Sequence, residues 1–163
     1  MKALLLLTFC ILVAGCDYTV PLATTPDLDR DPALIGLWQT KADDGKPQSL
    51  LVLPLGIREY LVSFPAGTSD AMFARAFLFR TVDRTLVQVE WIGTAAGKVP
   101  EDRRVYQYAA YTLTANELSL RLLNPDVVKR DAVSAGDLTL AMADHAKDSD
   151  AFRKPMVFTK TDR

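Results

Sequence analysis

The chain has 163 residues, 49% of them hydrophobic, which is enough for one domain of ordinary size. Its 19 basic and 20 acidic side chains leave no basic surplus for a phosphate backbone, so the composition argues against nucleic acid as a partner. The composition also excludes a disordered chain, a disulfide scaffold and a protein with several membrane spans. It leaves the biochemical activity open.

The first 16 residues, MKALLLLTFCILVAGC, hold 13 apolar side chains and a single charge, at Lys2. The apolar run 3–14 has about 12 residues and as a helix would span about 18 Å, which is too short to cross a bilayer. A short apolar run between a basic residue and small residues is typical of a secretory signal peptide. A short buried helix is the alternative.

The string VAGC at residues 13–16 resembles the lipobox of bacterial lipoproteins. The resemblance implies that residues 1–15 are cleaved off, that Cys16 carries a diacylglycerol thioether, and that its new amine is acylated, for example with palmitate. It also implies a protein anchored in the cell envelope, with its domain facing the periplasm or the exterior. Asp17 resembles the signal that retains enterobacterial lipoproteins on the inner membrane, and the choice between inner and outer membrane stays open. An ordinary signal peptide with an incidental cysteine is the alternative.

The only other cysteine, Cys10, lies in the segment that would be removed. The mature protein then has no free thiol and no disulfide, which excludes cysteine catalysis and thiolate metal sites. Cleavage removes one Lys and no acidic residue, so 18 basic and 20 acidic side chains remain, a net charge of −2. Several acyl chains on one residue are sufficient for lasting membrane attachment.

Residues 17–33 contain three of the nine prolines and four aspartates, without apolar periodicity. This pattern predicts an extended tether over 16–33 between the lipid and a domain at 34–163. Fully stretched, it would reach roughly 55 Å. The alternative is that part of it packs along the domain as an N-terminal arm.

The body of the chain is rich in short apolar runs that are separated by turn signals, and several of these runs alternate at period two. Val87, Val89 and Trp91, for example, alternate with polar residues. Consecutive strands without intervening helices favour a mainly β fold, an antiparallel meander that closes into a barrel because closure removes exposed edges. The predicted strands are Leu34–Thr40, Ser49–Leu53, Glu59–Phe64, Phe73–Val82, Thr85–Ile92, Val105–Leu113 and Glu117–Leu123.

The pattern changes after Leu123. Asn124 as N-cap, Pro125 at the first helical position and Gly136 as C-terminal cap predict a helix over Pro125–Ala135. The elements expected after it are a short strand at Asp137–Ala141, a second short helix at about Ala143–Phe152 and a final strand at Met156–Thr161.

The string DPALIGLW at residues 31–38 places a turn before the first strand and then Gly36 and Trp38 within it. This arrangement resembles the first-strand signature of lipocalin and calycin barrels. The resemblance implies that Trp38 plugs the closed end, that Gly36 allows a close approach there, and that an arginine covers the indole. Arg153 and Arg163 are the candidates considered for that arginine.

An eight-stranded barrel is just wide enough either to fill with side chains or to hold one small ligand. In the strand Phe73–Val82, one face carries aromatic residues and a charge, while the other carries small residues, and either face could line the interior. If the aromatic face points inward, Arg75 suits an acidic headgroup above an apolar pocket. The candidate ligand-binding residues are Phe73, Arg75, Phe77, Phe79, Tyr106 and Tyr108, with Tyr111 as a further polar contact. The alternative is that these aromatic residues simply fill the core.

Catalytic signals are almost absent. His145 is the only histidine and stands among charged residues, which indicates a solvated surface position. No catalytic residue, metal site or cofactor is therefore expected. Two functions remain: a barrel that binds a small apolar ligand or lipid, and a filled barrel that docks a protein partner in the periplasm as an assembly module.

Overall fold

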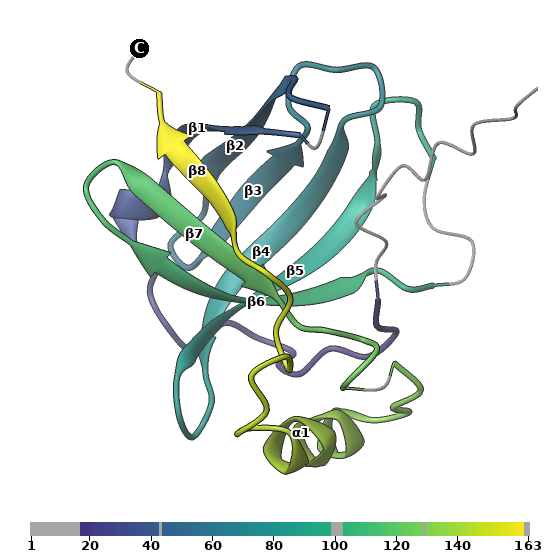
Figure 1. Cartoon of the computed structure of the whole chain (residues 1–163). Helices are drawn as coiled ribbons and strands as arrows, with labels where there is room; N and C mark the ends of the chain where they lie inside the picture. Colours follow the sequence, from purple (N-terminus) through teal and green to yellow (C-terminus); the bar gives the residue numbers. More distant parts are fainter. Residues whose placement is uncertain (1–16, 43, 99–102, 129, 162–163) are drawn as a thin grey trace, which may run out of the picture.

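The computed structural model describes residues 17–42, 44–98, 103–128 and 130–161. The predicted signal peptide, the cleavage site and Cys16 lie outside the described residues. Eight antiparallel strands follow one another around a closed barrel, and the last strand pairs with the first (Figure 1). The strands are β1 (Gly36–Lys41), β2 (Pro47–Leu55), β3 (Glu59–Phe64), β4 (Met72–Arg80), β5 (Thr85–Thr94), β6 (Tyr106–Leu113), β7 (Glu117–Leu122) and β8 (Met156–Lys160).

The predicted meander and its closure into a barrel are confirmed. Each strand that the alternation predicted has a counterpart within a few residues, because one face of every strand is buried in the barrel and period-two patterning marks that face. In β5, Val87, Val89 and Trp91 point inward, as their alternation requires.

A short helix near the C-terminus is confirmed, but the elements predicted between Leu123 and the last strand lie at the wrong residues. Residues 125–128 form turns, because the Asn124 side chain accepts a hydrogen bond from the Asp126 backbone at 3.2 Å and folds the chain locally. The helix α1 instead spans Ala135–Asp144, over the predicted strand Asp137–Ala141. Ser134 is its N-cap and accepts a hydrogen bond from the Asp137 amide at 3.1 Å. The second helix predicted near Ala143–Phe152 is replaced by turns after α1.

One end of the barrel is closed by the 3-10 helix η1 (Pro32–Leu34). Trp38 is fully buried beside it, and its indole Nε1 donates a hydrogen bond to the Leu34 carbonyl at 2.9 Å. The Lys160 ammonium lies 5.0 Å from the centre of the Trp38 ring. Gly36 has φ +146°, and a Cβ there would lie 3.1 Å from the Lys160 side chain. The cation over Trp38 is therefore a lysine, and the closed end is consistent with a lipocalin-like barrel.

Residues 17–31 lie along the outside of the barrel. They form an N-terminal arm, which was the alternative to the extended tether. Tyr18 forms an antiparallel bridge with Tyr106 at the start of β6. The Leu22 and Ala23 amides both donate hydrogen bonds to the Gln88 side chain on β5, at 2.9 and 3.0 Å. The arm is therefore held by specific contacts over β5 and β6.

The protein contains two hydrophobic cores. The inner core lies inside the barrel and consists of Leu34, Trp38, Leu50, Val52, Tyr60, Ala76, Leu78, Leu118 and Phe158. The outer core lies between the outside of β4, β5 and β6, the arm, and the segment that carries α1 (Figure 1). It consists of Tyr18, Phe77, Phe79, Leu86, Tyr108, Leu123, Val128 and Leu138.

Candidate functional site

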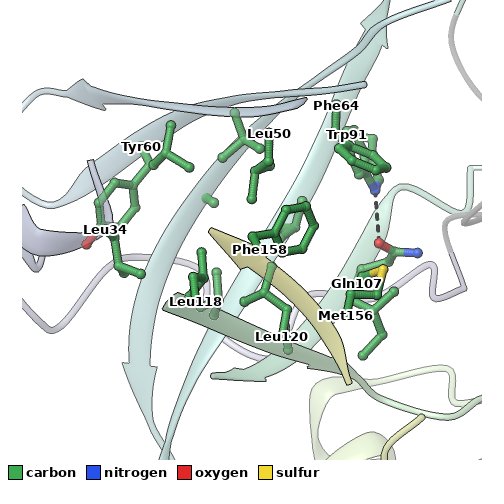
Figure 2. Close-up of a pocket in the computed structure, with 17 residues that line it drawn as sticks. Leu34, Leu50, Tyr60, Phe64, Trp91, Gln107, Leu118, Leu120, Met156 and Phe158 are labelled. Atoms are coloured by element: carbon green, nitrogen blue, oxygen red, sulfur yellow. Dashed lines mark hydrogen bonds between the residues drawn. The ribbon is translucent and has the colours of Figure 1, made fainter. Parts of the chain in front are cut away.

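The barrel encloses a cavity of about 120 Å³ (Figure 2). Its lining comes from β2 to β8 and from η1, and almost every lining side chain is aliphatic or aromatic. The lining residues are Leu34, Leu50, Val52, Tyr60, Val62, Phe64, Ala76, Val87, Val89, Trp91, Gln107, Ala109, Leu118, Leu120, Leu122, Met156 and Phe158. Such a surface attracts apolar groups by dispersion and by exclusion of water.

The two ends of the cavity differ. At the closed end, Leu34 of η1 and Tyr60 of β3 are buried. The Tyr60 hydroxyl is engaged by Asp31, whose backbone amide donates to it at 2.6 Å, and burial raises the Tyr60 pKa to about 12. At the opposite end, Phe64 and Met156 are only half-buried. We call this second end the open end.

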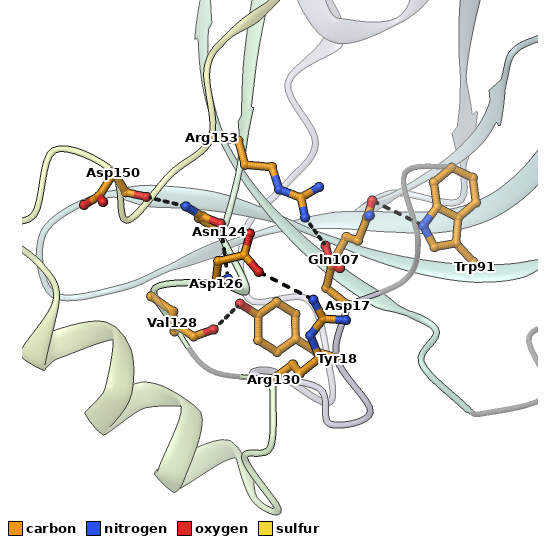
Figure 3. A network of polar contacts seen from close by, with 10 residues as sticks. All are labelled: Asp17, Tyr18, Trp91, Gln107, Asn124, Asp126, Val128, Arg130, Asp150 and Arg153. Carbon is orange, nitrogen blue, oxygen red and sulfur yellow. Dashed lines mark hydrogen bonds and ion pairs between the residues drawn. The ribbon is translucent and has the colours of Figure 1, made fainter. Parts of the chain in front are cut away.

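The polar side chain at the open end is Gln107, which is 3% exposed. Its Oε1 accepts a hydrogen bond from the Trp91 indole at 3.4 Å. Its side chain also hydrogen-bonds the Asp17 carboxylate. Figure 3 shows Gln107 between Trp91, which lines the cavity, and Asp17 at the start of the arm.

Asp17 is 5% exposed and lies 3.7 Å from a guanidinium nitrogen of Arg153. Burial raises the pKa of the Asp17 carboxyl, and the nearby Arg153 opposes that shift. A buried carboxylate requires such a partner, because an unpaired charge in a protein interior is strongly disfavoured. Arg153 therefore stabilises the start of the arm and does not cover Trp38, while Arg163, the other candidate, lies outside the described residues.

The ligand-binding residues predicted on β4 face away from the cavity. Arg75 lies on the outer surface, where it pairs with Glu59 and approaches Glu90 at 4.0 Å. Phe73 is 37% exposed, and Phe77 and Phe79 belong to the outer core. The face that points inward is the one with small residues, and Ala76 lines the cavity. The small-residue alternative therefore describes the inward face, and Arg75 does not line the cavity.

Tyr106 and Tyr108, which were predicted as ligand contacts on β6, also point outward. The Tyr106 hydroxyl donates to Glu90 at 3.3 Å. The Tyr108 hydroxyl donates to the Val20 carbonyl and accepts from the Leu22 amide at 3.1 Å, so it holds the arm in place. Tyr111 packs against the inner core but does not line the cavity.

Sequence reasoning did not identify the side chains at the open end of the cavity, above all Gln107. A signal was present: Gln107 stands between two tyrosines and shares its face with Ala109, so one face of β6 carries a polar and a small residue. The inward alternation of Trp91 placed it in the interior but did not identify Gln107 as its partner.

Within the residues that the structure describes, no group of three or more His, Cys, Asp or Glu side chains could hold a metal ion. His145 lies at the surface, and its ring nitrogen Nδ1 is 2.7 Å from Asp148. Over the same residues, no helix has the length and the apolar character needed to cross a bilayer.

Comparison of the chain with models of known families, with curated proteins and with solved structures found no match.

Proposed function

We propose that the protein is a bacterial envelope lipoprotein, anchored in a membrane through a lipid on Cys16, whose barrel binds a small apolar molecule or the apolar end of a lipid. The observation that carries the binding proposal is the apolar cavity of about 120 Å³ inside the barrel. The lipobox-like sequence at residues 13–16 supports the anchor.

The cavity volume limits the ligand. An apolar cavity of about 150 Å³ stays dry and accepts a molecule the size of benzene, and the cavity described here is slightly smaller. Drug-sized ligands occupy pockets of about 300 to 1,000 Å³. The ligand is therefore a ring-sized apolar group or a short length of hydrocarbon, and a larger molecule would enter only by one end.

The polar groups of the cavity support binding rather than catalysis. Among the described residues that line the cavity, Tyr60 is the one with a titratable side chain. Its hydroxyl already forms hydrogen bonds with the backbone of Asp31. Gln107 can offer its amide to a polar group at the open end. We propose no enzymatic activity, no cofactor and no nucleic-acid partner.

A second candidate function is docking of a protein partner in the periplasm. The small cavity volume favours it, since most of the barrel interior is filled. Four large apolar side chains that are more than half exposed could contribute to such a contact: Ile57, Val82, Val133 and Leu140.

The ligand is tested first by native mass spectrometry of the protein extracted from its own membrane. We expect a co-purifying apolar molecule. Titration with benzene, followed through the methyl NMR signals of the lining leucines and valines, then tests the cavity directly. Saturable shifts confined to the lining residues support binding, whereas benzene without effect on these signals contradicts it and favours docking.

A cavity-filling variant provides the matched control. Ala109 lines the cavity, so Ala109→Leu should abolish the benzene shifts. Thr112 is exposed on the same strand, so Thr112→Leu should leave them unchanged. The anchor is tested separately: Cys16→Ser should release the protein from the membrane, and a variant that keeps the mature mass and the membrane fraction of the wild type would contradict lipidation.

A further inference from the structure

We propose that the open end of the barrel faces the bilayer, so that the cavity takes the end of an acyl chain directly from a membrane lipid. The inference rests on the proposed lipid anchor at Cys16. It adds an orientation, a ligand class and a source of that ligand, and it follows from where the arm begins.

The first observation is the fixed position of Asp17, the residue after the proposed anchor. Its backbone amide donates to the Tyr106 carbonyl at 3.2 Å, and the neighbouring Tyr18 exchanges hydrogen bonds with Tyr106 at 3.1 and 3.0 Å. The Asp17 side chain is buried beside Arg153. Because consecutive Cα atoms are about 3.8 Å apart, a lipid on Cys16 is attached within one residue of the barrel wall.

The second observation is the end of the barrel at which Asp17 lies. Tyr106 begins β6, and the next residue, Gln107, contacts both Asp17 and the cavity-lining Trp91. Figure 3 shows this connection from Asp17 through Gln107 to Trp91. The residue that follows the proposed lipid attachment point therefore contacts a side chain at the open end of the cavity.

The third observation is that residues 17–31 do not form a free tether between the proposed anchor and the barrel. Residues 17–31 are used as the arm, which continues to the closed end, where Asp29 pairs with Arg58 at 3.0 Å and Asp31 contacts Tyr60. With Asp17 at the membrane, the arm leads away from it, and η1 becomes the distal end. A bilayer at the attachment point then meets the open end of the barrel.

Exposed apolar side chains near the open end fit this orientation. Phe73 is 37% exposed and Ile92 is 50% exposed. They lie close together, since Phe73 pairs with Gly93 across β4 and β5. Aromatic and aliphatic side chains at the level of the lipid headgroups add to membrane attachment. Hydrocarbon lies just below that level and matches the apolar lining.

The two tryptophans report the orientation, since Trp91 lies at the open end and Trp38 at the closed end. The lipidated full-length protein is reconstituted into phosphatidylcholine vesicles whose acyl chains carry bromine, which quenches indole emission at short range. We expect the emission of the wild type to fall by roughly half, because one of its two indoles lies at the bilayer. The emission of Trp91→Phe, which retains Trp38, should be almost unaffected.

Equal quenching of the wild type and Trp91→Phe would overturn the proposed orientation, and so would the absence of quenching in both. Insertion of six Gly and Ser residues between Cys16 and Asp17 supplies a second measurement, because a flexible linker releases the domain from the bilayer and should restore the emission of Trp91. Unchanged quenching after the insertion would show that the anchor does not set the orientation.

The same samples separate the failure of this inference from failure of the proposed function. The mass of the purified protein shows whether Cys16 is lipidated, and the benzene titration of the unlipidated Cys16→Ser protein shows whether the cavity binds. If both succeed and bromine quenches neither protein, the orientation alone is wrong.

Discussion

The inner and outer cores are built from opposite faces of the same strands, yet they use their residues differently. In the inner core, small side chains such as Ala76 and Ala109 leave a cavity. In the outer core, large aromatic side chains pack directly: the Tyr18 and Tyr108 rings lie 5.4 Å apart, and the Phe79 and Tyr108 rings 6.3 Å apart. The outer core fixes the arm and α1, while the barrel interior retains space.

The buried polar groups follow the same division. In the outer core, Gln88 and Tyr108 are engaged by the backbone of the arm. At the open end of the inner core, Gln107 connects the cavity to the first residue of the arm. The comparison teaches that the outer layer holds the arm and α1, that the interior retains the cavity, and that Gln107 is the contact between the two.

The largest expected effect comes from the closed end of the inner core. Trp38→Ala should lower the free energy of unfolding by about 3 to 5 kcal/mol, because it removes a fully buried aromatic side chain. Urea unfolding, followed by the emission of Trp91, measures the change. In Trp91→Phe, iodide should barely quench the remaining Trp38, and strong quenching there would contradict its burial.

The corresponding change in the outer core is Leu138→Ala on α1. Leu138 is fully buried, so this variant should lose about 2 to 5 kcal/mol of unfolding free energy. Leu140, on the same helix, is 67% exposed, and Leu140→Ala should change stability by less than about 0.5 kcal/mol. Equal effects of the two variants in urea unfolding would show that α1 does not pack as described.

Substitutions of two neighbouring alanines in β6 allow a direct comparison of how tightly the two cores are packed. Ala109 faces the cavity, whereas Ala110 packs against the outer core. Ala110→Leu should cost about 1 to 3 kcal/mol of unfolding free energy through overpacking, and Ala109→Leu should cost less because empty volume is available. A larger loss for Ala109→Leu in parallel urea titrations would reverse this comparison.

Asp17, which contacts Gln107 between the two cores, is expected to make the stability of the protein depend on pH. Burial raises the pKa of Asp17 in the folded protein above its usual value of 3.8, so folding favours its protonated form. Relative to Asp17→Asn, the wild type should therefore gain stability as the pH falls from 7 through the raised pKa toward 3.8. Unfolding of both proteins across this range, in the Cys16→Ser background, measures the difference, and a relative loss of wild-type stability on acidification would contradict it.

The smallest effect is expected at Arg75. Its guanidinium is about half exposed and pairs with carboxylates on the outer surface, so Arg75→Ala should cost less than about 1 kcal/mol of unfolding free energy. Because Arg75 is remote from the cavity lining, the benzene shifts should not change. Weaker binding in Arg75→Ala would place the ligand outside the barrel.

The strand Phe73–Val82 explains why the barrel could be predicted and the site could not. Alternation of apolar and polar residues marks a strand whenever one of its faces is exposed to solvent, and most strands of this barrel satisfy that condition. The outside of β4 is covered by the outer core, so Phe77 and Phe79 are as buried as Ala76 and Leu78. Sequence patterning cannot then tell which face lines the cavity, since that depends on an arm and a helix distant in the chain.

The segment after Leu123 was mispredicted for a different reason. The Leu138–Leu140 alternation suggests a strand, and Gly136 suggests the end of a helix. In the structure, Gly136 lies in the first turn of α1, because the Ser134 cap sets where the helix begins. An Asn side chain can cap a helix or begin a turn, so the residues at Asn124 fit both structures. The tertiary contacts of Val128 and Leu138 in the outer core decide that Asn124 begins a turn.

The pairing of β1 with β8 determines when the barrel can be completed during folding. The register joins Trp38 to Lys160 and Gln39 to Thr159, positions 122 and 120 residues apart in the chain. Pairing over such a distance is slow to form, and until β8 arrives the edge of β1 stays open to other strands. Because a chain is synthesised from its N-terminus, the first strand emerges long before its partner, and its edge stays unpaired until residues 156–160 follow.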